Sequence, residues 1–145
     1  MKTRLFNILK LLPVVMMAFT LGACDDLEID IEIEDQTESS VHYNTEYLTS
    51  RVWVDEWTDD DGIFYHQELC FYRNRVGTDY LYSEDRWGNC KESSYKFSWD
   101  WRNPRCTEIR MKYGPGDYSY MEHIMMGGNK LDCLLDGQPA YFIGK

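Results

Sequence analysis

The clearest alternation of apolar and polar positions in this chain lies between residues 94 and 101. Four aromatic residues there alternate with serine, lysine and aspartate; they are Tyr95, Phe97, Trp99 and Trp101. Residues 107–113 repeat the pattern with Ile109, Met111 and Tyr113. Because successive side chains of a strand point to opposite faces, this period of two predicts two strands with one apolar face each. The Asn103-Pro104 turn between them predicts a β-hairpin.

Turn-forming residues divide the rest of the chain at short, regular intervals. The seven breaks are Asp59 to Gly62, Asn74 to Gly77, Arg86 to Asn89, Arg102 to Pro104, Gly114 to Asp117, Gly127 to Asn129 and Asp136-Gly137. Between them lie eight short runs rich in aromatic and β-branched residues, which favour strands. We therefore expect an all-β domain, an eight-stranded antiparallel meander. It forms either an up-and-down barrel, which leaves no free edge, or a two-sheet sandwich. Residues 44–49 are expected to form a short helical turn that caps one end.

Composition places the folded domain in residues 43–145. This segment holds all five Trp, all eleven Tyr and four of the six Phe of the chain. Its 103 residues match the size of one small domain. Such aromatic content indicates a packed core rather than disorder.

The amino-terminal segment has the features of an export signal. Lys2 and Arg4 precede an apolar stretch at 11–19, and the small residues of Leu21-Gly22-Ala23-Cys24 follow it. The segment resembles a bacterial lipoprotein signal with its lipobox. That resemblance implies cleavage of residues 1–23 and attachment of diacylglycerol and an acyl chain such as palmitate to Cys24. The alternative is an ordinary cysteine after a transmembrane helix, but the apolar stretch is shorter than the roughly 20 residues that span a bilayer.

Residues 24–42 form an acidic tether. The acidic positions after Cys24 are Asp25, Asp26, Glu28, Asp30, Glu32, Glu34 and Asp35. The run resembles the export tag of Bacteroidetes surface lipoproteins, which implies an outer-membrane protein exposed at the cell surface. In enterobacteria an aspartate after the cysteine instead resembles an inner-membrane retention signal. A third interpretation is a solvated spacer that repels itself and extends.

Charge excludes some partners. Removal of residues 1–23 takes away three of the 15 basic residues and none of the 25 acidic ones, which leaves a net charge of −13. Such a balance disfavours binding to nucleic acid or to a bare anionic lipid surface. The expected membrane contact is the lipid anchor itself.

Several short motifs of the domain resemble those of small lipocalin-like lipoproteins of Bacteroidetes. The motifs are Leu48 to Trp53, then Leu69-Cys70-Phe71 before the Gly77 turn, and Asn129 to Gly137 followed by Ala140-Tyr141-Phe142. The resemblance covers residues 43–145 and implies a barrel that holds a ligand. Ser50 and Arg51 stand where the opening of true lipocalins has glycine, so ligand binding is an analogy at this point.

Aromatic residues are the candidate ligand contacts. Those of the predicted inner face line a pocket or fill a core; they are Trp53, Tyr95, Phe97, Trp99 and Trp101. Trp87 lies in a polar turn, where strand periodicity does not bury it. It either forms an exposed platform that stacks on a sugar face or folds back as a plug over the barrel end.

Four cysteines remain besides Cys24, and an even number in an exported domain indicates two disulfides. In a meander, Cys70 and Cys106 lie toward one end and Cys90 and Cys133 toward the other. This placement favours the pairs Cys70–Cys106 and Cys90–Cys133. Free buried thiols are the alternative. No closely spaced Cys/His pair suggests a metal.

No catalytic or cofactor-binding motif is present, and we expect no enzymatic activity and no cofactor. Three hypotheses remain for the function. The first is a lipid-anchored barrel that binds a small hydrophobic or extended ligand. The second is a surface module that binds a glycan or a protein, and the third is a structural accessory subunit of an envelope complex.

Overall fold

The computed structural model describes residues 30–145, with side chains from residue 37; the signal segment and Cys24 lie outside this part of the chain. One helix and eight strands follow in order: α1 (Asp30–Thr49), β1 (Val52–Thr58), β2 (Phe64–Phe71), β3 (Val76–Glu84), β4 (Cys90–Trp101), β5 (Ile109–Gly114), β6 (Asp117–Gly127), β7 (Lys130–Leu135) and β8 (Gln138–Gly144). Within these residues no helix is long and apolar enough to cross a membrane.

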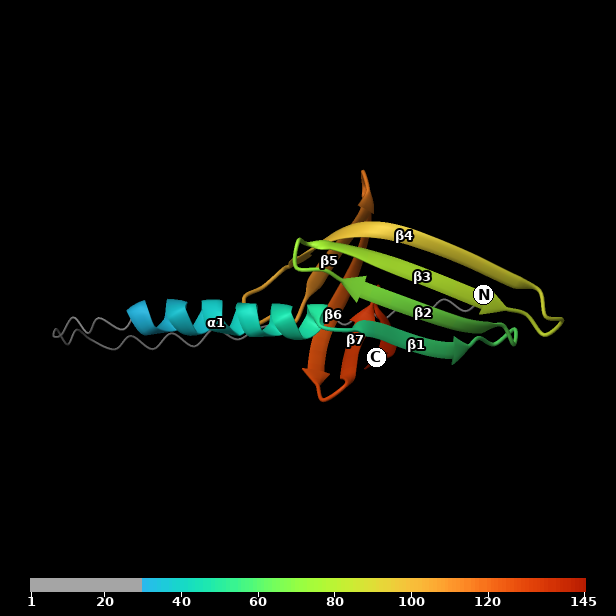
Figure 1. Ribbon diagram of the computed structural model, residues 1–145, viewed down its shortest axis with the longest axis horizontal. Helices are drawn as coiled ribbons and strands as arrows, with labels where there is room; N and C mark the ends of the chain where they lie inside the picture. Colours follow the sequence, from blue (N-terminus) through green and yellow to red (C-terminus); the bar gives the residue numbers. More distant parts are fainter. Residues whose placement is uncertain (1–29) are drawn as a thin grey trace, which may run out of the picture.

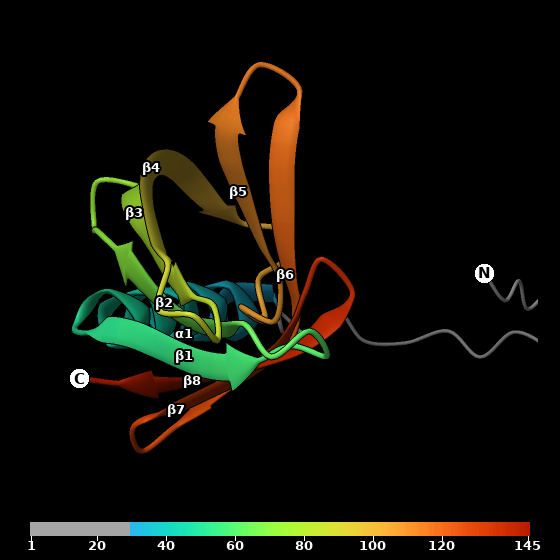
Figure 2. The same cartoon turned by 90° about the vertical axis from the view of Figure 1, so that its right-hand side faces the viewer.

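The eight strands form a closed antiparallel barrel in which each strand pairs with the next and β8 returns to β1 (Figure 2). The predicted meander is therefore confirmed, and the barrel rather than the sandwich is the correct alternative. The predicted hairpin is also correct, since Trp99 pairs with Met111 and Trp101 with Ile109. A shift of one residue would turn the charged side chains of both strands inward, so the alternating pattern fixes this register.

Large apolar side chains fill the half of the barrel nearest α1. Trp53, Phe71 and Trp99 are fully or almost fully buried there. The ring of Phe71 meets those of Phe97 and Trp99 edge-on, with centroids 5.4 and 5.5 Å apart, an arrangement favourable for aromatic pairs. Gly77 pairs with Phe97 on the neighbouring strand, and its missing side chain leaves the space that this ring occupies.

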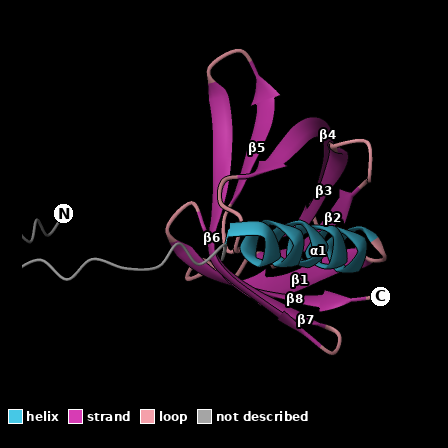
Figure 3. Cartoon of the chain, turned by 90° about the vertical axis from the view of Figure 1, so that its left-hand side faces the viewer, coloured by secondary structure: helices cyan, strands magenta, loops and turns pink. Residues whose placement is uncertain are grey.

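The carboxyl-terminal turns of α1 close this end of the barrel (Figure 3). Leu48 is fully buried in the core, and its carbonyl oxygen accepts a hydrogen bond from Nε1 of Trp53 at 2.9 Å. Nε1 of Trp101 donates to Oγ1 of Thr45 at 3.0 Å. The predicted cap at residues 44–49 is thus correct in place, because these residues bring the end of the helix into the core.

The helix is much longer than the predicted turn. It begins at Asp30, crosses the predicted boundary between tether and domain at residues 42 and 43, and projects away from the barrel (Figure 1). Acidic residues near a helix amino terminus interact favourably with the helix dipole, so the charges of this segment are compatible with a helix. The apolar and polar residues of this segment do not separate onto two helix faces, which is why the sequence pattern did not predict a helix here.

The structure contains neither predicted disulfide, because all four cysteines of the barrel are free. Strand register explains the difference. Cys133 pairs with Ala140 and lies in the barrel core, whereas Cys90 begins β4 and is exposed. Cys70 alternates with the core residues on either side of it in β2, while Cys106 is buried in the loop between β4 and β5. Two cysteines at the same end of a barrel therefore do not meet when their side chains occupy different faces.

Candidate functional site

The half of the barrel opposite α1 contains two adjoining cavities. The first has a volume of about 450 Å³ and the second of about 400 Å³. Gln67 and Leu135 line both, so the cavities meet at these two side chains. The apolar core therefore occupies one half of the barrel and leaves the other half hollow.

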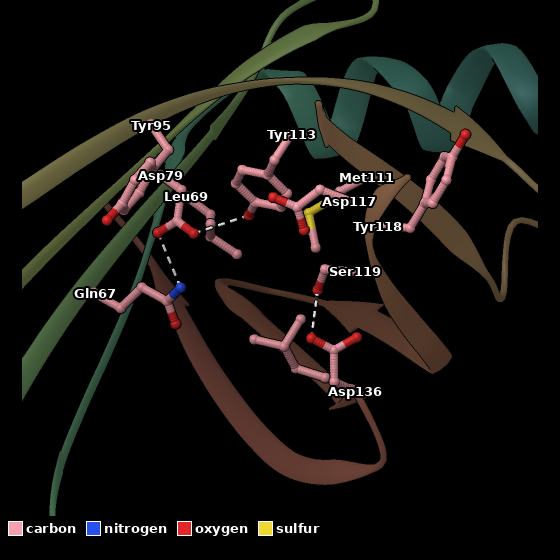
Figure 4. A pocket seen from close by; sticks show the side chains of 11 residues that line it. Gln67, Leu69, Asp79, Tyr95, Met111, Tyr113, Asp117, Tyr118, Ser119 and Asp136 are labelled. Atoms are coloured by element: carbon pink, nitrogen blue, oxygen red, sulfur yellow. Dashed lines mark hydrogen bonds between the residues drawn. The ribbon is translucent and has the colours of Figure 1, made fainter. Parts of the chain in front are cut away.

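Residues from six strands and one turn line the first cavity. They are Gln67, Leu69, Asp79, Tyr95, Met111, Tyr113, Asp117, Tyr118, Ser119, Leu135 and Asp136 (Figure 4). Leu69 and Met111 belong to the buried core and form the apolar floor. Polar and aromatic side chains form the walls above it. A partly enclosed, concave surface with an apolar floor and a few converging polar groups is typical of small-molecule sites.

Asp79 is the centre of a hydrogen-bond network in the first cavity (Figure 4). Its Oδ1 accepts from Nε2 of Gln67 at 2.9 Å, and its Oδ2 accepts from the hydroxyl of Tyr113 at 2.8 Å. Burial raises the pKa of Tyr113 well above its ordinary value, and the charge of Asp79 raises this pKa further. The Tyr113 hydroxyl therefore remains a donor at neutral pH and fixes the orientation of the carboxylate.

A second hydrogen-bonded carboxylate joins two hairpins at the cavity mouth. Oδ2 of Asp136, in the turn between β7 and β8, accepts from Oγ of Ser119 at 2.6 Å. Its Oδ1 accepts from the main-chain nitrogen of Tyr120 at 2.8 Å. Both donors belong to β6. These contacts hold the β5–β6 hairpin, which rises from the barrel in Figure 2, against the β7–β8 turn.

The second cavity is more apolar. Its lining consists of Trp57, Gln67, Leu135, Gln138, Pro139 and Ala140. The ring of Trp57 stacks on that of Tyr65 with centroids 5.1 Å apart and planes inclined by 11°. The hydroxyl of Tyr65 donates to Oδ2 of Asp59 at 3.1 Å, and this hydrogen bond raises the pKa of Tyr65. Tyr65 and Asp59 thus hold the indole in place as a wall of the cavity.

Most of the predicted inner-face aromatics fill the core, which is one of the two roles expected for them. Trp53, Phe97 and Trp99 fill the closed half of the barrel, and Trp101 packs against the helix end. Among the predicted inner-face aromatics, only Tyr95 lines the first of the two cavities in the open half. Because the large rings of the first group interlock, they leave no space between them for a ligand.

Trp87 does not plug the barrel. Its side chain is 73% exposed in the turn between β3 and β4, and the guanidinium carbon of Arg86 lies 4.5 Å from its ring centroid. The turn itself is held by Asp85, whose carboxylate accepts from the main-chain nitrogens of Trp87 and Asn89. The exposed alternative for this residue is therefore the correct one.

The sequence did not identify the polar residues of the first cavity. Asp79 occupies an inward position of β3 because it pairs with Leu69 and Tyr95. An acidic residue in a strand is normally assigned to the solvent face. One signal was available in the sequence. The period of two that includes Met111 and Tyr113 predicts that Tyr113 points into the barrel, and its hydroxyl is a hydrogen-bond partner of Asp79.

No protein-family model matches this chain, and no curated protein matches it significantly. The fold and the site define its class: a small closed β-barrel with one filled half, one hollow half and a helix over the filled end. Within the described residues, no group of three or more His, Cys, Asp or Glu side chains is arranged to hold a metal ion. The cavities offer hydrogen-bond acceptors, aromatic rings and an apolar floor.

Proposed function

We propose that this protein is a non-enzymatic, lipid-anchored protein of the bacterial outer envelope that binds a small ligand in the hollow half of its barrel. The pair of adjoining cavities is the observation that supports ligand binding. Their volumes of about 450 and 400 Å³ lie within the range of about 300–1,000 Å³ typical of small-molecule sites. The anchor is proposed from the lipobox resemblance at Cys24, and surface exposure from the acidic run after it.

Native mass spectrometry tests ligand binding. The mature chain from residue 24, carrying Cys24→Ser so that no lipid is attached, retains every residue of the barrel and of α1. Exported and purified without detergent, it is expected to carry a small-molecule adduct that is lost on denaturation. A protein that carries no adduct under these conditions contradicts the proposal.

Two matched substitutions locate the adduct. Ser119→Trp places a large ring in the first cavity, whereas Ser98→Trp places the same ring on the outward, exposed face of β4. We expect the adduct to disappear from the first variant and to remain in the second. Loss from both or retention in both would place the adduct outside the cavity.

Metabolic labelling with a fatty acid tests the anchor. Cells that express the full chain are expected to incorporate label into the protein and to retain it in the outer-membrane fraction. Cys24→Ser removes the acceptor thiol and is expected to abolish labelling. Protease treatment of intact cells then tests surface exposure, since only a surface protein is digested.

A surface interaction module is the second candidate function, and the exposure of Trp87 favours it. Aromatic rings at a protein surface stack on sugars and are common in protein interfaces. Under this candidate, Trp87→Ala abolishes binding to a glycan or protein partner, whereas Ser119→Trp has no effect. A purely structural accessory subunit would instead co-purify with an envelope protein and be insensitive to both substitutions.

A further inference from the structure

The first cavity has a strongly unbalanced charge. Three of its eleven lining residues are aspartates, Asp79, Asp117 and Asp136, and none is lysine, arginine or histidine. A carboxylate or phosphate of a ligand placed there would face three like charges and no basic residue of the lining. A positively charged group would instead gain from each of them, more strongly than in bulk water because the site is partly enclosed.

Asp79 is prepared to receive such a group. Gln67 and Tyr113 each donate one hydrogen bond to a different oxygen of this carboxylate, at 2.9 and 2.8 Å. A carboxylate oxygen accepts more than one hydrogen bond, so both oxygens keep capacity for a further donor. The two neighbours therefore orient Asp79 without using up its ability to bind an ammonium N–H.

Aromatic rings complete the walls around this carboxylate. The rings of Tyr95 and Tyr113 meet edge to face with centroids 6.4 Å apart, and both line the cavity. Cations bind favourably over the faces of such rings. Tyr118 also lines the cavity, but Arg110 and Lys112 already lie 5.7 and 5.9 Å from its ring centroid. Tyr95 and Tyr113 are therefore the rings available to a ligand.

The second cavity provides a different environment beside the first. Its lining contains Trp57, Leu135, Pro139 and Ala140 and no charged residue. Gln67 and Leu135 line both cavities, so the two lie on either side of these side chains and a long ligand has a second site beside the first. The pair of cavities is thus acidic and aromatic in the first and apolar in the second.

The second cavity lies where β1 and β8 separate. These strands pair at Trp53 with Gly144 and at Val54 with Ile143, whereas β1 pairs with β2 over its whole length. Past the pair of Val54 and Ile143, the main-chain nitrogen of Tyr141 donates to Oδ2 of Asp55 at 3.3 Å instead of to the main chain of β1. Trp57 of β1 and Pro139 of β8 then face the cavity from its two sides. This separation gives room for an apolar group that is longer than the first cavity alone accommodates.

We propose that the ligand of this barrel is an organic cation with an apolar body. Its ammonium group lies between Asp79 and the rings of Tyr95 and Tyr113, and its body lies along Trp57 and Pro139. The proposal rests on the proposed ligand-binding function and specifies the chemical class of the ligand. Neutral lipids and anionic metabolites are excluded by the same assignment, because neither supplies a charge that offsets the three aspartates.

Three probes with the same apolar body test the assignment. Phenylbutylamine, phenylbutanol and phenylbutyrate carry a positive, neutral and negative head group at neutral pH. Isothermal titration into the mature Cys24→Ser chain, at about 0.15 M salt to screen distant surface charge, measures each affinity. We expect the amine to bind about tenfold or more tightly than the alcohol, and the acid not to bind.

Three substitutions separate the cavity from the general acidity of the chain. Asp79→Asn is expected to weaken the amine about tenfold and to leave the alcohol unchanged. Asp117→Asn removes a second charge of the cavity and leaves the hydrogen bonds of Asp79 intact. It is also expected to weaken the amine, so it tests the proposal even if Asp79→Asn unfolds the barrel. Asp60→Asn, in the exposed β1–β2 turn, is the control and is expected to have no effect.

The outcomes distinguish the proposal that the ligand is a cation from the proposal that the barrel binds a ligand at all. Equal or tighter binding of the alcohol or the acid overturns the cationic class but leaves a ligand-binding barrel. An equal loss in Asp60→Asn shows that surface charge attracts the amine and also overturns the assignment. Failure of all three probes overturns it as well, while the adduct measured by native mass spectrometry decides independently whether the barrel binds a ligand.

Discussion

Nε1 of Trp53 donates a hydrogen bond to the carbonyl oxygen of Leu48 at a distance of 2.9 Å. The bond connects the first barrel strand to the end of α1, and both side chains are fully buried. A carbonyl at a helix end has no partner within the helix, so the indole satisfies a group that would otherwise be buried unpaired. The helix end and the barrel core are therefore one cooperative unit.

Trp53→Phe tests this connection. The substitution removes the donor and part of the ring volume, and we expect a loss of about 1–3 kcal/mol in the free energy of unfolding, measured by urea denaturation. Trp101→Phe is the comparison, since it removes a bond to the partly buried Thr45 and is expected to cost less. A Trp53→Phe protein as stable as the parent would show that the helix end contributes little to the core.

Gly77→Ala is expected to be strongly destabilising. A Cβ at this position would overlap the ring of Phe97 and lie 2.7 Å from the carbonyl oxygen of Cys70. Overpacking of a core typically costs about 1–3 kcal/mol, which should appear as a lowered thermal midpoint. Gly127→Ala is the matched control, because a Cβ there meets no atom within 4 Å. Phe97→Leu in the same chain should partly restore the loss.

The four thiols of the barrel are expected to react at different rates with a thiol reagent. Cys90 is exposed and should react first. Burial, with a further contribution from Asp55, raises the pKa of the Cys133 thiol to about 12, so this residue remains protonated and protected at neutral pH. Cys106 is also buried and should react only after unfolding. Detection of four thiols in the unreduced, denatured protein confirms free cysteines, whereas fewer would restore the disulfide prediction.

His66 is expected to make stability depend on pH. Hydrogen bonds from its ring nitrogens to Glu68 and Glu56, at 3.0 and 2.8 Å, raise the pKa of His66 above 6.5 in the folded protein. The charged imidazole therefore stabilises the fold fully below the unfolded pKa, and this contribution is lost as pH rises through the raised folded value.

His66→Gln measures the contribution directly. The difference in unfolding free energy between parent and variant should be about 1 kcal/mol at mildly acidic pH and should shrink at alkaline pH. Replacing Glu56 and Glu68 together by glutamine should flatten the same curve. A difference that grows with pH would contradict the assigned direction of the pKa shift.

The sequence predicted the eight-stranded meander, with a barrel or a sandwich as its two closures, because apolar and polar residues alternate along the strands. The alternation within Tyr95 to Trp101 and within Ile109 to Tyr113 identifies the inward face of each strand without knowledge of the neighbouring strands. The cavity could not be predicted in this way. Asp79 is inward only because it pairs with Tyr95, and that pairing depends on the length of the β3–β4 turn. Long-range register, rather than local pattern, determines which polar residues line the hollow half.

Of the two roles expected for the inner-face aromatics, most of them take that of filling a core, and the disulfide prediction was wrong for a related reason. Aromatic residues on an inward face either line a barrel or fill it, and here Trp53, Phe71 and Trp99 pack with the other buried apolar side chains to fill one half. The pairs of cysteines were chosen by the barrel end at which each residue lies. The face on which each side chain lies, which decides whether two sulfur atoms meet, depends on the register of the whole barrel.

The position of α1 also has a consequence for the direction in which a barrel anchored through Cys24 would face. Its twenty residues extend about 30 Å, and its carboxyl-terminal end closes the side of the barrel opposite the cavities. A protein held to a membrane from the amino-terminal side of this helix would stand away from the lipid with its mouth turned outward. Molecules from the surrounding medium would meet the opening directly, whereas a lipid leaving the bilayer would first have to pass the helix and the closed half of the barrel.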